Sequence, residues 1–309
     1  MRILARGIIC ALLVAFVAAA AGAAPLEWPA LADQYKYDQA APLNVELGTE
    51  TAGLLGTEFP LKFTSANGQR VPGLLLLPPA GAGKAPYPCV LILHGLGGSK
   101  KDARALAPLL SKGYMALALD AQYHGDRKQE GKELFSADLA GLQQGFIQTI
   151  IDYRRAMDYL ATRPDVDAKR IGLVGASMGA IMGSVLSGVD SRVKATVLLV
   201  GGGDWQTMLG KSTNPAAVKM REAMGEKPDL SKLDPIDPVH YIEHVSPRPL
   251  LMQNASKDDV VPPACAQALW DRAKDPKAID WYATGHTLDD PAARMAVFMK
   301  IMDWLGKNL

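Results

Sequence analysis

The sequence predicts an α/β fold with a mostly parallel central sheet, helices on both faces of that sheet and a small cap insertion. Short, continuously apolar runs alternate with helix-length segments, of which the longest is 137–162. Strands that are apolar on both sides are typical of a parallel sheet covered by helices. The runs are VLILH (90–94), YMALALD (114–120), IGLVG (171–175), ATVLLV (195–200), PLLMQ (249–253) and AIDWY (278–282).

The first residues have the pattern of a secretory signal peptide. Two arginines precede an apolar run at 8–17, and small residues follow it. Ala21 and Ala23 form an A-x-A site, so we expect a signal peptide at 1–23 and a periplasmic or secreted protein made of residues 24–309. The apolar run is shorter than the ~20 residues of a spanning helix. No membrane partner is therefore expected after cleavage.

The next segments frame the predicted sheet. Residues 24–57 have weak periodicity and are expected to form an N-terminal arm packed on the body. Two strand-like runs flank Asn67-Gly68, which indicates a β-hairpin. Residues 201–246 then interrupt the alternation with polar, Met-rich and Pro-rich segments. A connection of this length is usually functional or disordered, and we interpret it as a small cap over the strand ends.

The charge balance limits the kinds of binding partner that we expect, and the cysteine positions bear on whether a disulfide forms. The 309 residues carry 33 Lys and Arg against 32 Asp and Glu, so nothing favours nucleic acid or an anionic membrane. A small-molecule partner is expected, and no oligomeric state is predicted. After cleavage Cys89 and Cys265 remain. Cys89 is at the start of one predicted strand and Cys265 lies past the far end of another. Five residues of strand span ~16 Å, whereas a disulfide needs Cα atoms within ~6 Å of each other. We expect no disulfide.

Reactive side chains follow the apolar runs. Ligands of an open parallel sheet bind outside the carboxyl ends of its strands, so the residues directly after each run are candidates for a site. Five such residues carry reactive side chains: His94, Asp120, Ser177, Asp258 and His286.

Ser177 is the candidate nucleophile. It lies in GASMG, a Gly-x-Ser-x-Gly pattern between a predicted strand and helix, where a tight turn exposes the serine. This turn aims the Met178 N–H at an oxyanion. The glycine-rich loop after His94 offers the Leu96 N–H as a second donor. The alternative interpretation is a packing turn with a passive serine.

A serine nucleophile needs a base and a group that orients the base. His286 follows the last strand, on the same edge of the sheet as Ser177, and is the expected base. A carboxylate in the loop SKDDVVPP is expected to accept a hydrogen bond from the imidazole. From the residues alone, both Asp258 and Asp259 are candidates for this role.

Three further residues are candidates for a substrate pocket. Tyr123 and His124 lie in DAQYHGDR, beyond the second run, and form either a structural network or a pocket wall. Trp205 follows GGGD at the start of the cap and either lines the acyl pocket or packs in the core. His94 is expected to shape the oxyanion loop and to transfer no proton.

A zinc hydrolase is the competing interpretation. The stretch HYIEH fits H-x-x-E-H, in which His240 and His244 would bind the metal and Glu243 would act as the base. Pro238 and Pro247 limit any helix here to under three turns, and no third ligand is evident. We therefore expect no metal and no cofactor, with the histidines in water and the segment anchoring the cap.

The order Ser177, Asp258, His286, with HGLGG early and GASMG after a strand, resembles the α/β-hydrolase superfamily over essentially the whole mature chain. The segments DAQYHGDR and DPVHYIEHVSPRPLLMQNASKDDVVPP are similar to stretches of dienelactone-hydrolase-like and acetyl-esterase-like members. In that pattern the triad acid lies four residues before a proline of the acid loop. The resemblance therefore implies Asp258, since Pro262 follows it at that spacing.

The resemblance implies a serine esterase that hydrolyses a small-molecule carboxylic ester through an acyl-enzyme. Dienelactone hydrolases proper have a cysteine nucleophile where this chain has Ser177, so their particular activity is not expected. A thioesterase or a small-peptide hydrolase would use the same residues. A non-catalytic binding protein is less favoured, because no member of the expected triad is missing.

Overall fold

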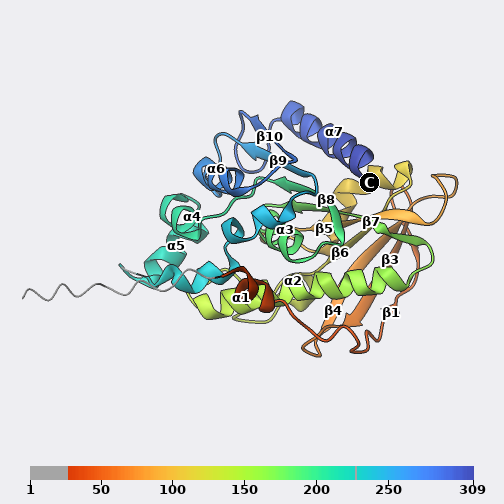
Figure 1. Ribbon diagram of the computed structural model, residues 1–309, viewed down its shortest axis with the longest axis horizontal. Coiled ribbons are helices and arrows are strands. Elements are labelled where there is room, and N and C mark those ends of the chain that lie inside the picture. The colour runs from red at the N-terminus through yellow and green to blue at the C-terminus, as the bar shows by residue number, and fades with distance from the viewer. Residues whose placement is uncertain (1–26, 227) are drawn as a thin grey trace, which may run out of the picture.

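The computed structural model describes residues 27–226 and 228–309; the predicted signal peptide lies outside them. Ten strands form one sheet in the order β1-β3-β4-β6-β5-β7-β8-β9-β10, and β2 pairs with β3 (Figure 1). The strands are β1 (Glu46–Leu47), β2 (Thr51–Ala52), β3 (Thr57–Thr64), β4 (Arg70–Leu77), β5 (Tyr87–Leu93), β6 (Met115–Leu119), β7 (Val166–Ala176), β8 (Val193–Leu199), β9 (Leu250–Ala255) and β10 (Lys277–Tyr282).

The antiparallel end of the sheet contains the predicted hairpin. β3 and β4 pair antiparallel around Asn67-Gly68, where Gly68 has a φ of +79° that a residue with a side chain rarely adopts. The Asn67 side chain accepts a hydrogen bond from the Gln69 N–H at 3.0 Å and closes the turn. β4 then pairs antiparallel with β6 and joins the hairpin to the rest of the sheet.

The rest of the sheet is parallel. β6, β5, β7, β8, β9 and β10 pair in parallel, each with its neighbour in that order. Every apolar run of the sequence lies on one of these strands, so the predicted mostly parallel sheet is confirmed. Because parallel strands end on the same side, the residues after all six strands meet at one edge.

Helices cover both faces of the sheet, as predicted. One face packs on α2 (Leu139–Thr162), α3 (Met178–Val189) and α6 (Pro263–Arg272), and the other on the 3-10 helix η1 (Lys100–Lys112) and α7 (Pro291–Asn308). Figure 1 shows α2 and α7 on opposite sides. Successive residues of a strand point to opposite faces; in β5, Leu91 packs with the first group and Val90 with the second.

Residues 201–246, predicted as a cap, run from β8 to β9 as five short helices. They are α4 (Trp205–Lys211), α5 (Pro215–Met224), η3 (Leu230–Ile236), η4 (Pro238–His240) and η5 (Ile242–Val245). In Figure 1, α4 and α5 extend beyond the end of the sheet. Asp237 holds the entry to α4 because its carboxylate accepts the N–H groups of Asp204 and Trp205, both at 2.9 Å. Burial raises the pKa of this carboxyl.

The N-terminal arm is anchored on the cap. It contains α1 (Trp28–Asp33), and the Trp28 ring stacks on His244 with ring centres 3.4 Å apart. Tyr35 is fully buried and meets Tyr241 edge to face. Across the described part of the chain, none of the helices is long and apolar enough to span a membrane.

Candidate active site

Ser177 occupies a strained turn between β7 and α3. Its backbone has φ 53° and ψ −118°, a conformation that costs a non-glycine residue on the order of 1–3 kcal/mol. The turn is held by the Ser177 N–H, which donates to the Leu199 carbonyl at 2.9 Å. Glycines make it possible: a Cβ on Gly175 would lie 2.3 Å from the Gly179 carbonyl oxygen, and one on Gly179 would lie 2.0 Å from that of Leu93. This geometry lifts the serine side chain off the sheet.

The structure brings Ser177, His286 and Asp258 into one hydrogen-bonded chain. Ser177 Oγ lies 2.8 Å from His286 Nε2, and His286 Nδ1 lies 2.7 Å from Asp258 Oδ2. An ionised carboxylate only accepts, so Nδ1–H donates to Asp258 and Nε2 is left to accept the serine proton. The Asp258 side chain is 2 % exposed and that of His286 14 % exposed. The arrangement has the geometry of a nucleophile, its base and an orienting acid.

The structure distinguishes Asp258 from Asp259. The Asp258 carboxylate also accepts the N–H groups of Val260 and Val261, at 2.9 and 2.8 Å, which fixes its second oxygen on the turn. Asp259 instead contributes its backbone carbonyl, which accepts the Thr213 N–H at 3.0 Å. Asp259 therefore ties the acid loop to the cap, and its neighbour faces the imidazole.

Two backbone N–H groups are available for an oxyanion. Met178 is the first residue of α3, where helical N–H groups have no acceptor within the helix. Leu96 is the second residue of a turn closed by the Gly98 N–H and the Gly95 carbonyl at 3.1 Å, and Gly97 has a φ of +77°. Leu96 and Met178 line one pocket together with Ser177.

His94 holds the loop that carries Leu96. The residue is 4 % exposed; Nδ1 donates to the Gly95 carbonyl at 2.8 Å, and Nε2 accepts the Ala121 N–H at 3.1 Å. Both nitrogens are thus in use, in the neutral tautomer. Burial lowers the pKa of His94 and favours that form. The ring supports the oxyanion loop, since both of its nitrogens bond to backbone groups.

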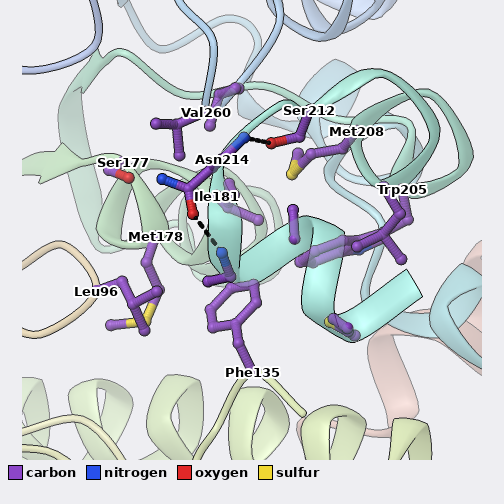
Figure 2. A pocket seen from close by; sticks show the side chains of 15 residues that line it. Leu96, Phe135, Ser177, Met178, Ile181, Trp205, Met208, Ser212, Asn214 and Val260 are labelled. Carbon is purple, nitrogen blue, oxygen red and sulfur yellow. Dashed lines mark hydrogen bonds between the residues drawn. The ribbon is translucent and has the colours of Figure 1, made fainter. Parts of the chain in front are cut away.

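A mostly apolar pocket of about 570 Å³, open on one side, leads from Ser177 under the cap (Figure 2). The predicted Trp205 lines it, but Phe135, Asn214 and Val260 were not predicted. Val260 lies in the SKDDVVPP loop, two residues after Asp258, whereas no motif surrounds Phe135 or Asn214. Its remaining walls are Ile181, Met208, Leu209, Ser212, Ala216, Ala217, Met220 and Val261.

Comparison with known proteins places this site in a family. Residues 73–297 match the Dienelactone hydrolase family. The chain belongs to the dienelactone hydrolase family. The matched range includes Ser177, Asp258 and His286, so every member of the hydrogen-bonded chain lies within it.

Several known proteins are similar to this chain in sequence or in structure. The esterase YjfP of Escherichia coli K12 is 27% identical over 191 residues, which are 60% of this chain and 74% of YjfP. An acetyl xylan esterase from Paenibacillus sp. R4 superposes with a TM-score of 0.74 at 20% identity, covering 91% of this chain and 92% of that one. Acetyl xylan esterase 1 from Thermoanaerobacterium sp. JW/SL YS485 gives 0.72 at 20% identity, covering 90% and 91%. These likenesses show that the fold is the α/β-hydrolase fold.

In this dienelactone hydrolase family member, Tyr123 and His124 do not line the pocket beside Ser177. The chain turns at Tyr123, which has a φ of +62° and lines a separate polar hollow. His124 is buried with its Nδ1 2.9 Å from the Gln122 carbonyl. Nearby, Arg127 pairs with Asp152 at 2.6 Å. The segment is therefore a structural network, the first of the two interpretations given above.

The HYIEH stretch has no zinc-site geometry in this family member. His240 ends η4 and His244 lies in η5, so the two histidines are not one turn apart on a single α-helix. The expectation that both histidines lie in water is wrong for His244, because its ring stacks on Trp28; Glu243 pairs with Lys274 at 2.7 Å. Among residues 27–226 and 228–309, no three His, Cys, Asp or Glu side chains gather where they could hold a metal ion. The stretch anchors the cap and the N-terminal arm.

The two cysteines of the described region are free and buried. Cys89 lies in the centre of the sheet on β5, whereas Cys265 lies in the first turn of α6. Burial raises the pKa of each thiol to about 12. Neither thiol is therefore suited to act as a nucleophile, whereas the Ser177 hydroxyl lies 2.8 Å from the imidazole of His286.

Proposed function

We propose that this protein is a serine hydrolase that cleaves carboxylic esters through an acyl-enzyme. The observation that carries the proposal is the chain of hydrogen bonds from Ser177 through His286 to Asp258, at 2.8 and 2.7 Å, at the mouth of an apolar pocket. Membership of the dienelactone hydrolase family and the similarity to the esterase YjfP support it.

The geometry suits the two halves of an acyl transfer. Ser177 Oγ attacks the ester carbonyl carbon while His286 Nε2 takes its proton, and the N–H groups of Leu96 and Met178 stabilise the oxyanion that forms. The C–O bond to the alcohol then breaks, and His286 gives its proton to the departing oxygen. A water repeats the sequence: His286 deprotonates it, it attacks the acyl carbon, and Ser177 Oγ leaves with the proton.

The pocket is assigned to the acyl group. His286 must reach the oxygen of the leaving alcohol, so the alcohol lies on the side of the imidazole. The pocket is lined by Ser177 and by both oxyanion residues, Leu96 and Met178, but His286 is not among its lining residues. The carbonyl substituent that remains on the serine therefore extends into the pocket, and the alcohol remains near the protein surface.

The walls favour an apolar acyl group of short to medium length. The volume of about 570 Å³ includes the open mouth, so the enclosed part of the pocket is smaller. Met208 and Met220 line it, and unbranched methionine side chains adapt their shape to different ligands. We expect several acyl lengths to be accepted, with an optimum set by how far the pocket extends from Ser177.

The test is hydrolysis of nitrophenyl esters from acetyl to dodecanoyl by wild type and Ser177→Ala, each with and without EDTA. We expect wild-type activity to survive EDTA and the variant to keep less than ~1% of kcat, because loss of a triad nucleophile typically costs far more than a hundredfold. Ser191→Ala, a serine in an exposed turn, is the matched control and keeps full activity.

Two results would count against this proposal. Activity that Ser177→Ala retains would remove the serine from the reaction, and activity lost to EDTA would revive a metal mechanism. Acyl thioesters and small peptide amides belong in the same panel, because the same residues serve a thioesterase or a peptide hydrolase. A higher kcat/KM on either of these than on every oxygen ester would reassign the substrate class.

A further inference from the structure

The polar side chains of the acyl pocket are Ser177, Trp205, Ser212 and Asn214. Three of them already have partners. The Ser177 hydroxyl is bonded to the catalytic imidazole. Trp205 Nε1 and the Ser212 hydroxyl donate to backbone carbonyl oxygens, at 3.5 and 3.2 Å. Only the carboxamide of Asn214 remains to be accounted for.

Asn214 is held in one orientation. It caps the N-terminus of α5: its Oδ1 accepts the Ala216 N–H at 2.9 Å, which requires the oxygen to be on that side. Its own N–H donates to Ser212 Oγ at 3.3 Å, so the backbone is fixed as well. The Nδ2 group points the other way, and Figure 2 shows it on the side of Ser177. Within the described chain it donates to no acceptor.

Capping alone does not require asparagine. Serine and aspartate cap a helix about as well, since each offers an oxygen to the first free N–H groups. Of these residues, only asparagine also presents two amide hydrogens on the opposite side. A donor left unpaired against an apolar ligand is unfavourable once its water is displaced. A substrate that supplies an acceptor there removes this penalty.

We propose that Asn214 determines specificity by donating a hydrogen bond from Nδ2 to the acyl group. The favoured substrates are then esters whose acyl chain has an acceptor oxygen (ether, hydroxyl or keto) near the reacting carbonyl, with an apolar remainder under Trp205. The inference rests on the proposed esterase function and adds to it the chemical class of the acyl group.

The test uses two nitrophenyl esters of equal shape, the methoxyacetate and the butyrate, in which an ether oxygen replaces one methylene. The ratio of their kcat/KM values is measured for wild type and for two variants, Asn214→Asp and Asn214→Ser. Both variants keep a capping oxygen for Ala216, and both lose the amide donor. Because each ratio is compared with the wild-type ratio, the greater intrinsic reactivity of the methoxyacetate cancels.

We expect the methoxyacetate preference to fall by about 3- to 10-fold in both variants, the range of one neutral hydrogen bond. Met220→Leu, which changes the same pocket without removing a donor, is expected to leave the ratio within about twofold. A ratio unchanged within twofold in both Asn214 variants would overturn the assignment, as would an equal fall in Met220→Leu.

The two proposals fail in different ways. Each ester is also measured with Ser177→Ala. If that variant still hydrolyses both esters, the esterase mechanism itself is wrong. If it hydrolyses neither while the Asn214 variants keep the wild-type ratio, the mechanism stands and only the role of Asn214 is lost. Circular dichroism and the melting temperature of each Asn214 variant check that α5 is still capped.

Discussion

Adjacent carboxylates in the acid loop have different tasks. The Asp258 carboxylate bonds to His286 on one oxygen and to two backbone N–H groups on the other. Asp259 is exposed, and its backbone carbonyl accepts hydrogen bonds from the cap. The loop therefore separates the orientation of the base from the attachment of the cap, although the two residues are neighbours.

Substitution of each carboxylate tests this division. In Asp258→Asn the Oδ1 acceptor of the turn is kept, but the amide that replaces Oδ2 favours the wrong imidazole tautomer. We expect kcat on nitrophenyl butyrate to fall about 10³- to 10⁴-fold. Asp259→Asn keeps its backbone carbonyl and is expected to stay within about threefold of wild type. Similar losses in both variants would contradict the assignment.

Individual site residues could be predicted where they follow a recognisable strand or lie in a sequence motif. Ser177, Asp258 and His286 each follow a recognisable strand, and the structure brings them together at one edge of the sheet. Phe135 and Asn214 were not found because they belong to irregular segments, where nothing in the local sequence indicates which side chains face a pocket. Asn214 has a capping signal, since Pro215 follows it, but that signal says nothing about its amide hydrogens.

At the scale of elements, α3 lies unusually close to the sheet. A Cβ on Gly179 would come within 2.4 Å of both the carbonyl carbon and the carbonyl oxygen of Leu93. The contact is with backbone of β5, which is fixed by strands on both sides and has no room to move. The first turn of α3 therefore requires glycine at this position, and the strained turn at Ser177 depends on it.

Alanine scanning of glycines tests this contact. We expect Gly179→Ala to destabilise the protein by at least about 3 kcal/mol or to prevent folding, because overpacking against fixed backbone is relieved only by moving the helix. Gly210→Ala in α4 has no atom within 4 Å of the new methyl. It is expected to be neutral or to stabilise by about 0.5–1 kcal/mol. Urea unfolding measures both, and a normal stability for Gly179→Ala would refute the packing argument.

The elements themselves were predictable to different degrees. The six apolar runs all became strands, because a stretch that is apolar on both faces fits only a covered sheet. The cap divides into helices of three to ten residues, with prolines inside or at the start of several. Their bounds could not be predicted, since such short helices are set by side-chain caps and tertiary contacts more than by periodicity.

At the scale of the molecule, the order of the strands in the sheet could not be predicted from the sequence patterns. β6 lies between β4 and β5, so the connection from β6 to β7 has to cross over β5. Nothing local encodes this order; it depends on which crossover lets the helices cover both faces. The structural likenesses to acetyl xylan esterases extend over about nine-tenths of the chain and so agree with the fold as a whole.

We propose that the protein acts after export, on the strength of the signal pattern at residues 1–23. Its thiols suit an oxidising compartment: Cys89 and Cys265 are buried, and burial raises the pKa of both to about 12, which suppresses thiolate oxidation. N-terminal sequencing of protein from the periplasm or medium is expected to start at Ala24. Protein found there with Met1 intact would contradict cleavage.

The stacking of Trp28 on His244 has a consequence for how the chain is made. Trp28 and Tyr35 of the arm are synthesised early, whereas their partners Tyr241 and His244 belong to the last quarter of the chain. During synthesis the arm has nothing to close on, and contacts so distant in sequence form slowly. The arm is thus expected to be among the last parts of the described chain to reach its final packing.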